Sequence, residues 1–375
     1  MKVLHLISGG DTGGAKTHII SLLKGLNKLM DAKVVCFIED TFYFDAKKEG
    51  LNIEVYKQKN RADMSVVNRL ADEINNDGYD IVHCHGARAN FIAMFLKRKI
   101  KRPLITTIHS DYKLDFKDNF YKRLVYTSLN TVALKMFNYY IAISDTFKEM
   151  LKSRGFKEDR IFVAYNGIDI ENKLEIIPKK EFLDKFNVNY EDKKIVGIVA
   201  RLDLVKDHDL FIKSAAGILK TRKDIIFLIA GDGNLENELK LRTRELGIEN
   251  NVYFLGYVQD TDSFFNAIDI NVLTSKSESF PYVILEGARL KKPIITTNVG
   301  GIRNLIKDGE NGYLIPVGDV EALQTRILAL IDNEELLNKL GENLFNDVKE
   351  NYSTRAMGQR HIEIYNEIIE LSGGK

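Results

Sequence analysis

The second half of the sequence opens with KIVGIVARLDLVKDHDLFIKSA, residues 194–215. Residues 195–200 are apolar apart from one glycine, which is typical of a strand buried in a parallel sheet. After a polar loop, Leu210, Phe211 and Ala215 follow at helical spacing. This order predicts a strand, a loop and a helix, the unit from which doubly wound α/β domains are built.

The same unit recurs along the whole chain. Short runs rich in Val and Ile alternate with amphipathic stretches, which predicts parallel strands covered by helices on both faces. The runs are KVLHLIS (2–8), AKVVCFI (32–38), DIVHCHG (80–86), PLITTIH (103–109), YYIAIS (139–144), IFVAYNG (161–167), KIVGIVAR (194–201), IIFLIAGDG (225–233), NVYFLGY (251–257), INVLTS (270–275) and PIITTN (293–298). A strand-poor passage, ENKLEIIPKKEFLDKF (171–186), interrupts them. We therefore predict two Rossmann-like, doubly wound domains.

The predicted boundaries are 1–175 for the first domain and 176–352 for the second. Residues 353–375 form a terminal helix, whose helical spacing is marked by Ile362, Ile364, Tyr365 and Ile368. Open α/β sheets bind ligands at the carboxyl ends of their strands. Two such domains facing each other would hold a ligand in a central cleft.

Composition agrees with a two-domain globular protein. The chain has 375 residues, of which 45% are hydrophobic and 29% charged, so a single small module and a disordered chain are excluded. Cys36 and Cys84 lie inside apolar runs and offer neither a disulfide framework nor a Cys-x-x-Cys zinc pair. No apolar stretch reaches the ~20 residues of a spanning helix. The glycine loop follows the N-terminus too early for a signal peptide, and we expect a cytoplasmic protein.

The charge is unevenly distributed. Residues 1–175 carry 28 Lys+Arg and 22 Asp+Glu, whereas residues 176–375 carry 26 and 31. The basic residues of the first half include a group at Lys97, Arg98, Lys99, Lys101 and Arg102, followed by Lys113, Lys117, Lys122 and Arg123. This pattern fits peripheral contact with an anionic membrane, and equally fits solvated helix ends.

A glycine loop, GGDTGGA (9–15), joins the first predicted strand to the first helix. Backbone N–H groups at such a helix start suit a phosphate or a sugar hydroxyl, although a plain tight turn is the alternative. Ala15 stands where a P-loop needs glycine, and the dinucleotide spacing G-x-G-x-x-G is absent. Both of those nucleotide motifs are therefore weak here.

Two cations mark the end of the first strand of the second domain. Arg201 follows that strand and Lys206 comes five residues later. At the carboxyl edge of a sheet, a guanidinium and an ammonium can neutralise a diphosphate; the alternative is solvated surface charge. Asp207 and Asp209 imitate a metal-binding Asp-x-Asp, but we expect them to cap the next helix.

The segment TSKSESFPYVILEGARLKKP (274–293) carries two glutamates. Glu278 follows a buried strand, Pro281 fits the first position of a helix, and Glu286 lies within an apolar helical run. A buried carboxylate needs a partner, which is either a ligand or a structural salt bridge. The spacing of eight residues lets both glutamates address one ligand at the helix start.

The first domain also contains several histidines. His83 and His85 share one strand face, but a zinc site needs further ligands, and none has suitable local spacing. We therefore expect no metal. His85 ends its strand and is a candidate for acceptor contact, whereas His5 and His18 are interpreted as packing or cap residues.

Together these elements resemble glycosyltransferase family 4, the retaining enzymes with the GT-B fold. The resemblance rests on Glu278-x7-Glu286, ARLDLVK with Arg201 and Lys206, GDTGGA, and NGID from Asn166 to Asp169, supported by TTNVGG (296–301) and NGYLI (311–315). It implies a nucleoside-diphosphate sugar donor, most simply UDP-linked, and a glycan or lipid-linked acceptor in cell-surface polysaccharide synthesis. It also implies that the C-terminal helix returns to the first, acceptor-binding domain. No cofactor, metal or nucleic acid is expected.

The resemblance also implies roles for individual residues. Arg201 and Lys206 would bind the donor diphosphate, and Glu286 the ribose. Glu278 and the backbone after Phe280, including Pro281 and Tyr282, would hold the sugar; Gly256 and Val258 would flank the base. Gly13 and Gly14 would approach sugar or phosphate, and His109 would serve the reaction centre. His85 and Asn166 are the candidates for acceptor binding.

The sequence departs from the family pattern at a few positions, and other functions are compatible with it. Asp11-Thr12 and Tyr165 differ from the family pattern and bear on the choice of acceptor and sugar. The rival functions are a nucleotide-sugar epimerase of the same fold, a non-catalytic nucleotide-sugar-binding protein and a P-loop kinase.

Overall fold

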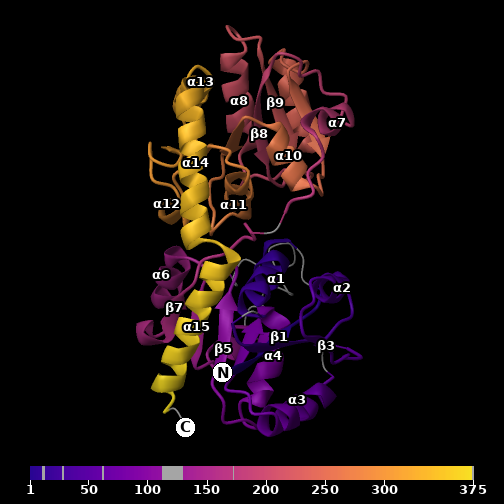
Figure 1. The fold of residues 1–375 in the computed structure, drawn as a ribbon, viewed down its shortest axis with the longest axis vertical. Coiled ribbons are helices and arrows are strands. Elements are labelled where there is room, and N and C mark those ends of the chain that lie inside the picture. The colour runs from indigo at the N-terminus through magenta and orange to yellow at the C-terminus, as the bar shows by residue number, and fades with distance from the viewer. Residues whose placement is uncertain (11–12, 28, 61–62, 112–129, 172, 374–375) are drawn as a thin grey trace. The chain divides into compact units, whose positions relative to one another are not determined.

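The computed structural model describes residues 1–10, 13–27, 29–60, 63–111, 130–171 and 173–373. These residues form two compact units (Figure 1). Unit 1 comprises Met1–Asp169 and Tyr352–Lys375, and unit 2 comprises Ile170–Asn351. The C-terminal segment thus belongs to the unit that contains the N-terminus.

Unit 1 is built on a seven-stranded sheet with the order β3-β2-β1-β4-β5-β6-β7, all pairs being parallel. Its central strands are apolar and buried throughout, as parallel strands covered on both faces must be. The strands are β1 (Lys2–Ile7), β2 (Asp31–Cys36), β3 (Ile53–Val55), β4 (Ile81–His85), β5 (Leu104–Ile108), β6 (Tyr139–Ala142) and β7 (Ile161–Val163).

Helices cover both faces of this sheet. Leu4 and Leu6 pack with α3 and α4 on one face, whereas Val3 and Ile7 pack with α1 and α15 on the other, because successive strand residues point to opposite faces. The helices are α1 (Gly13–Asn27), α2 (Thr41–Lys48), α3 (Ser65–Asn76), α4 (Gly86–Leu96), α6 (Asp145–Ser153), the 3-10 helix η1 (Glu158–Arg160) and α15 (Thr354–Leu371).

The terminal helix α15 packs closely on α1 (Figure 1). A Cβ on Gly25 of α1 would lie 2.1 Å from the carbonyl oxygen of Thr354, and one on Gly358 would lie 2.7 Å from Gly25. Glycine is therefore required where the helices meet. Ser353 caps α15 by accepting from the Ala356 N–H, and Ile364, Tyr365 and Ile368 are buried against the sheet. The predicted return of the terminal helix is confirmed.

Unit 2 contains a six-stranded parallel sheet with the order β10-β9-β8-β11-β12-β13. Strand β9 is buried at every position, as its run of apolar residues predicts. The strands are β8 (Lys194–Val199), β9 (Ile225–Ala230), β10 (Val252–Gly256), β11 (Ile270–Leu273), β12 (Ile294–Thr297) and β13 (Tyr313–Ile315).

The helices of unit 2 also lie on both faces of its sheet. Val196 and Ile198 belong to a core with α8 and α13, and Ile195 belongs to a core with α7 and α10. The helices are α7 (Lys179–Asp184), α8 (His208–Ile218), α9 (Glu236–Glu245), α10 (Thr261–Ala267), α11 (Tyr282–Arg289), α12 (Ile302–Leu305), α13 (Val320–Ile331) and α14 (Glu334–Asn351).

Two Rossmann-like units are thus present, as the sequence predicts. Both strand orders place the first strand at the centre and run outward on either side, the doubly wound pattern that brings ligands to the carboxyl ends of the strands. Within the described residues, no helix is long and apolar enough to cross a membrane.

Candidate functional site

Lys206 and Glu278 form an ion pair at the carboxyl edge of the unit 2 sheet. The Lys206 Nζ lies 2.5 Å from Glu278 Oε1, and the Ser275 hydroxyl donates to the same oxygen at 2.6 Å. The two side chains are only 24% and 9% exposed. The sequence predicts these residues as separate ligands; the structure brings their charged groups together.

Arg201 lies on the loop that follows β8. Its side chain is 74% exposed, and it contacts Asp203 through Nε and Nη2, both 2.7 Å from Oδ2. Although burial opposes ionisation, the hydrogen bond from Arg201 lowers the pKa of the Asp203 carboxyl. An exposed guanidinium held at its base by a carboxylate keeps donors available for an anion.

Backbone and side-chain contacts fix this loop against its neighbours. Asp203 Oδ1 accepts from the N–H groups of Val205 and Lys206 at 3.0 and 3.2 Å. Thr274, after β11, donates its hydroxyl to the Lys206 carbonyl at 2.8 Å. Lys206 is therefore held by main-chain geometry as well as by its ion pair, so its ammonium is preorganised.

Glycines allow the strand-end loops to approach one another closely. Gly300 has φ +50°, and a Cβ there would lie 1.8 Å from the Glu278 carbonyl oxygen. Gly231, after β9, has φ +143°, and a Cβ would lie 2.0 Å from the Ala200 carbonyl oxygen. Side chains in these loops would push the Arg201 and Glu278 segments apart.

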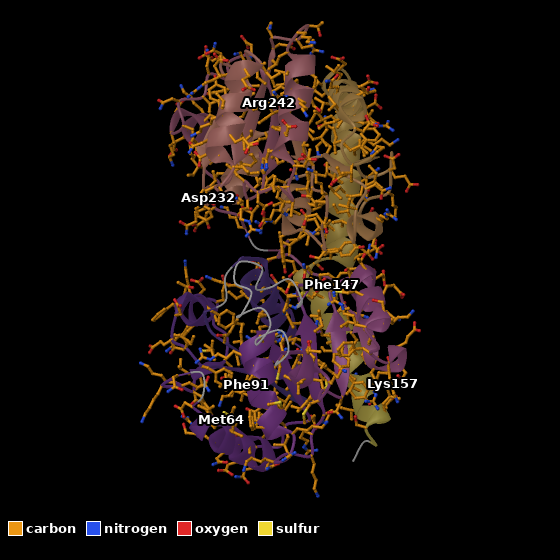
Figure 2. The ribbon with its side chains drawn as sticks, turned by 180° about the vertical axis from the view of Figure 1, so that it is seen from behind. Met64, Phe91, Phe147, Lys157, Asp232 and Arg242 are labelled. Atoms are coloured by element: carbon orange, nitrogen blue, oxygen red, sulfur yellow. The ribbon has the colours of Figure 1, made fainter. Side chains whose placement is uncertain are left out.

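The base-flanking candidates lie at the end of β10. Gly256 has φ +68°, and its carbonyl accepts from the Gly231 N–H at 2.7 Å. Val258 is buried, whereas the intervening Tyr257 is 74% exposed. Figure 2 labels Asp232, in the neighbouring loop after β9. The ends of β8, β9 and β10 thus form one edge.

Helix α11 begins one residue later than the sequence predicts. Pro281 is its N-cap, and Tyr282 is the first helical residue. Pro281 has an extended ψ of 124°. It therefore precedes the helix and is not part of it. Phe280 is buried and so anchors the turn between Glu278 and the helix.

Glu286 has no salt bridge within the described part of the chain. Arg289, one turn away, pairs instead with Asp262 of α10. Burial raises the pKa of the Glu286 carboxyl to about 7. The Arg289 guanidinium opposes this shift through its charge but makes no salt bridge with Glu286 in the described part of the chain. The structural salt bridge that the sequence allowed is therefore not formed, and a ligand contact stays a prediction.

The expected cap of α8 is only partly correct. Asp207 is the N-cap residue, but it has φ 49° and makes no side-chain capping bond; its carboxylate lies 3.3 Å from the Lys276 ammonium. Asp209 lies in the first turn and pairs with Lys213 at 2.6 Å. The left-handed backbone at Asp207 turns its carboxylate away from the helix N–H groups.

The unit 1 candidates lie at the carboxyl ends of the central strands and at the start of α1. Helix α1 begins at Gly13 and includes Gly14, while Asp11-Thr12 lies outside the described residues. His109 directly follows β5 and is partly exposed. His85 ends β4 and is 1% exposed, so its contacts are with protein groups.

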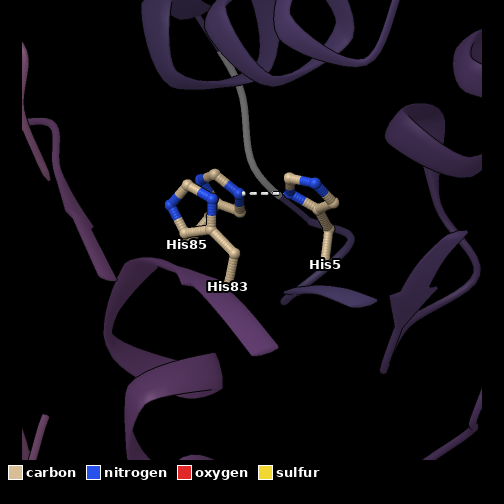
Figure 3. Close-up of side chains that lie close together, drawn as sticks. All are labelled: His5, His83 and His85. Atoms are coloured by element: carbon tan, nitrogen blue, oxygen red, sulfur yellow. Dashed lines mark hydrogen bonds between the residues drawn. The ribbon is translucent and has the colours of Figure 1, made fainter. Parts of the chain in front are cut away.

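Six of the seven histidines form one cluster in unit 1, which the sequence did not predict. His5 Nδ1 lies 3.1 Å from His85 Nε2, a contact that Figure 3 marks with a dashed line. His85 Nδ1 lies 3.4 Å from His109 Nε2. The rings of His18 and His109 are 4.5 Å apart. The cluster, hereafter the histidine cluster, consists of His5, His18, His83, His85, His109 and His361.

Strand register explains the cluster. His5 lies opposite His83, and Ile7 opposite His85, in the β1–β4 pair, so the odd-numbered residues share a sheet face. His18 comes from α1 and His361 from α15, the helices that cover this face. Local spacing shows only His83 and His85; the other four members come from elements far apart in the sequence.

Hydrogen bonds order the cluster further. His83 contacts the Tyr365 hydroxyl and the Thr107 hydroxyl, both at 2.7 Å. His18 Nδ1 donates to the Asn166 side-chain oxygen at 2.8 Å, and Asn166 is buried. The expected packing or cap role of His5 and His18 agrees with their burial but does not include these polar contacts.

Burial keeps the cluster neutral. It lowers the pKa of His5 and of His361 to about 3, and that of His18 to about 4. It lowers the pKa of His83, His85 and His109 well below the usual value as well. Neighbouring histidines add to the effect because two imidazolium ions at these distances repel.

Comparison with known families identifies the chain. Residues 12–172 match the model "Glycosyltransferase Family 4", and residues 179–347 match "Glycosyl transferases group 1", so the two matches together take in most of the sequence. The chain belongs to glycosyltransferase family 4, and its two Rossmann-like sheets are those of the GT-B fold. The predicted family and fold are confirmed.

Several relatives have assigned functions. "UDP-Gal:alpha-D-GlcNAc-diphosphoundecaprenol alpha-1,3-galactosyltransferase" of Escherichia coli is 25% identical over 313 residues, covering 82% of this chain and 80% of that protein. "Capsular polysaccharide biosynthesis glycosyltransferase CapM" of Staphylococcus aureus is 30% identical, covering 63% of each chain. The crystal structure of HepE from Anabaena in complex with UDP has a TM-score of 0.80 at 22% identity, covering 98% of this chain and 100% of that chain.

Proposed function

We propose that this glycosyltransferase is a retaining, metal-independent hexosyltransferase that transfers a sugar from a UDP-sugar to a lipid-linked or glycan acceptor in cell-surface polysaccharide synthesis. The supporting observation is the set of charges at one sheet edge, where Arg201 and the Lys206–Glu278 pair lie together. The E. coli relative is named for a UDP-galactose donor and a diphosphoundecaprenol acceptor. The S. aureus relative is named for capsule synthesis.

In this proposal unit 2 binds the donor. Arg201 and Lys206 bind the diphosphate, and Glu286 accepts hydrogen bonds from the ribose. Glu278 and the Tyr282 amide hold the sugar, while Phe280 and Pro281 shape their turn. Gly256 and Val258 flank the base.

Unit 1 would bind the acceptor, with His109 near the sugar. Gly13 and Gly14, at the start of α1, approach sugar or phosphate through their backbone. Asn166 and His85 act on the acceptor side through His18 and His109, the neighbours they contact. The proposed division of roles follows the predicted boundaries, 1–175, 176–352 and 353–375.

Leaving-group stabilisation is the main catalytic device in this proposal. Cleavage of the bond between the anomeric carbon and the phosphate oxygen leaves negative charge on UDP, and the acceptor oxygen bonds to that carbon from the same face. The acceptor proton leaves with UDP or with solvent. Fixed cations stabilise the developing charge without reorganisation.

The test is a turnover screen of nucleotide sugars with and without lipid-linked acceptors. We expect UDP formation only when donor and acceptor are both present. Donor conversion without acceptor would identify an epimerase, and donor binding without conversion would identify a sensor. Turnover of ATP alone would indicate the kinase.

Glu286 predicts a pH-dependent donor affinity. Its carboxyl has a pKa of about 7. The ionised form offers both oxygens as acceptors to the ribose hydroxyls, whereas protonation turns one of them into a donor. Between pH 6 and 8 the ionised fraction rises about tenfold, so affinity for the donor should rise by up to that factor. Titration calorimetry with a UDP-sugar, whose diphosphate diester does not titrate here, measures this. Glu286→Gln should bind more weakly and without the pH dependence; an unchanged slope would remove the assignment.

His109 is expected to affect turnover more than nucleotide binding. His109→Ala should lower kcat ~100-fold, the scale for losing a positioned polar group at the reacting centre, while the Kd for UDP stays nearly constant, because the proposed diphosphate ligands lie in unit 2. Steady-state kinetics and calorimetry give the two values. Equal losses in both would contradict the role.

We propose that the protein works at the cytoplasmic face of the membrane. Arg98 and Lys99 line a pocket of about 480 Å³ together with Met64 (labelled in Figure 2), Met94 and Phe95, which joins basic and apolar groups on one surface. The sequence groups Lys97 with these basic surface residues, but its ammonium donates a hydrogen bond to Asn138 at 2.6 Å. Lys101 and Arg102 line a different pocket, together with Lys97. Lys113, Lys117, Lys122 and Arg123 lie outside the described residues. Sedimentation with anionic but not neutral liposomes at low salt is expected; equal sedimentation would exclude it.

A further inference from the structure

The histidine cluster contains two groups of three histidines whose ligand atoms lie within 4.8 Å of one another, His5–His83–His85 and His18–His85–His109. The first, drawn in Figure 3, is poorly suited to a metal because both nitrogens of His83 are already bonded to hydroxyl groups at 2.7 Å. An ion would have to break one of those bonds. Among the described residues, no hydroxyl group competes for the nitrogens of the second group.

The second group has ligand nitrogens within 4.8 Å of one another, and its hydrogen bonds leave lone pairs for an ion. His18 Nδ1–H donates to Asn166, which leaves the lone pair on Nε2, and this buried atom has no hydrogen-bond partner among the described residues. His85 Nδ1 and His109 Nε2 are 3.4 Å apart. An ion about 2.05 Å from both would subtend an angle of about 110°, which is tetrahedral.

Groups behind the ligands would hold them in place. Asn166 fixes the tautomer of His18. His85 Nε2–H can donate to His5 Nδ1 at 3.1 Å, which frees His85 Nδ1 for an ion. Metal-binding histidines characteristically donate their other N–H to such a partner. Their imidazoles are neutral at pH 7, so an ion displaces no proton.

We propose that His18, His85 and His109 form a transition-metal site in unit 1 that binds Zn²⁺, with a solvent-derived ligand completing the coordination beside the partly exposed His109. Three imidazoles suit Zn²⁺ and disfavour Mg²⁺, which selects oxygen ligands. When Zn²⁺ is bound, the His109 side chain cannot act in sugar transfer. This consequence rests on the proposed function. Bound Zn²⁺ would then inhibit the enzyme. It would not be the cation that neutralises the diphosphate of the donor.

The test measures binding directly. Protein freed of metal by a chelator is titrated with Zn²⁺ by calorimetry and with Co²⁺ by visible absorption, which reports tetrahedral coordination. We expect one site per chain, no response to Mg²⁺, and affinity lowered at least ~10-fold by His18→Gln and by His109→Gln. His109→Gln is the more conservative test of folding because that side chain is partly exposed.

His208→Gln is the matched control. His208 is the one histidine outside the cluster, it is buried in unit 2, and neither nitrogen has a hydrogen-bond partner in the described part of the chain. Its substitution should leave Zn²⁺ affinity unchanged. Absence of stoichiometric binding, or binding that the His18 and His109 variants retain in full, would overturn the site. Donor turnover in chelator is measured in parallel, so failure of the metal site and failure of the proposed transferase activity are distinguished.

Discussion

Lys206→Ala is expected to lower kcat by roughly a hundredfold to a thousandfold, equivalent to about 3 to 4 kcal/mol, the usual loss when one preorganised transition-state donor is removed. The ammonium lies 2.5 Å from Glu278 and is held by the loop after β8. Its removal takes away a fixed charge and also leaves Glu278, which is 9% exposed, without its countercharge. Initial rates with a saturating donor measure the effect.

Variants of neighbouring cations sharpen this prediction. Arg201→Ala should lower kcat on the same scale. Lys206→Arg should not recover the activity of the native enzyme, because a planar guanidinium does not reproduce the geometry of a compact ammonium group. Lys213→Ala on α8 is the matched control. Lys213 pairs with Asp209 and is 44% exposed, so its loss should leave kcat unchanged.

Chelation tests whether these cations replace a divalent ion. Turnover in excess EDTA should persist, and if Zn²⁺ occupies the histidine cluster it should rise. Full loss in EDTA that Mg²⁺ or Mn²⁺ restores would show that a metal carries the leaving-group charge. The proposed role of Arg201 and Lys206 would then be wrong.

The sequence predicts most of the fold because its central strands are continuous apolar runs. Each of the eleven predicted runs contains a strand. The strands β3 and β13 were missed: both have three residues and form sheet edges. A strand of three residues is too short to show a hydrophobic pattern unless the apolar run continues beyond it, as it does for the edge strand β7.

The candidate site was predictable where its residues are local. Arg201 and Lys206 share one loop, and Glu278 and Glu286 share one strand–helix connection, so spacing along the chain reveals them. Their pairing was not visible, because Lys206 meets Glu278 across 72 positions of sequence. The histidine cluster was hidden for the same reason, since it depends on strand register and on where α15 packs.

The histidine cluster is expected to make unit 1 sensitive to acid. His5, His18 and His361 have folded-state pKa values of about 3 to 4 because they are buried, whereas an unfolded histidine titrates near 6.5. Below about pH 6.5 the unfolded chain therefore binds more protons than the folded chain, and the free energy of unfolding falls as pH falls. The loss continues until the folded-state pKa is reached.

The expected size of the loss is large compared with the stability of a domain. From pH 7.5 to 5.5 each such histidine lowers the free energy of unfolding by about 1.4 kcal/mol, so these three together account for about 4 kcal/mol. A whole protein is stable by only ~5 to 15 kcal/mol, and His83, His85 and His109 shift in the same direction. Unit 2 has a single comparable group, His208, with a pKa of about 4.

Urea denaturation in chelator between pH 5.5 and 7.5 measures this loss without a contribution from bound metal. A probe of unit 1, such as amide exchange on β1 and β4, should lose protection at a higher pH than one of unit 2. His361→Gln removes one titrating ring. It should reduce the slope of the free energy of unfolding against pH by an amount equivalent to at most one bound proton, even if the substitution also changes the stability at every pH. Equal stability of unit 1 at pH 5.5 and 7.5 would contradict this prediction. It would mean that the histidines bind protons in the folded state as readily as in the unfolded chain.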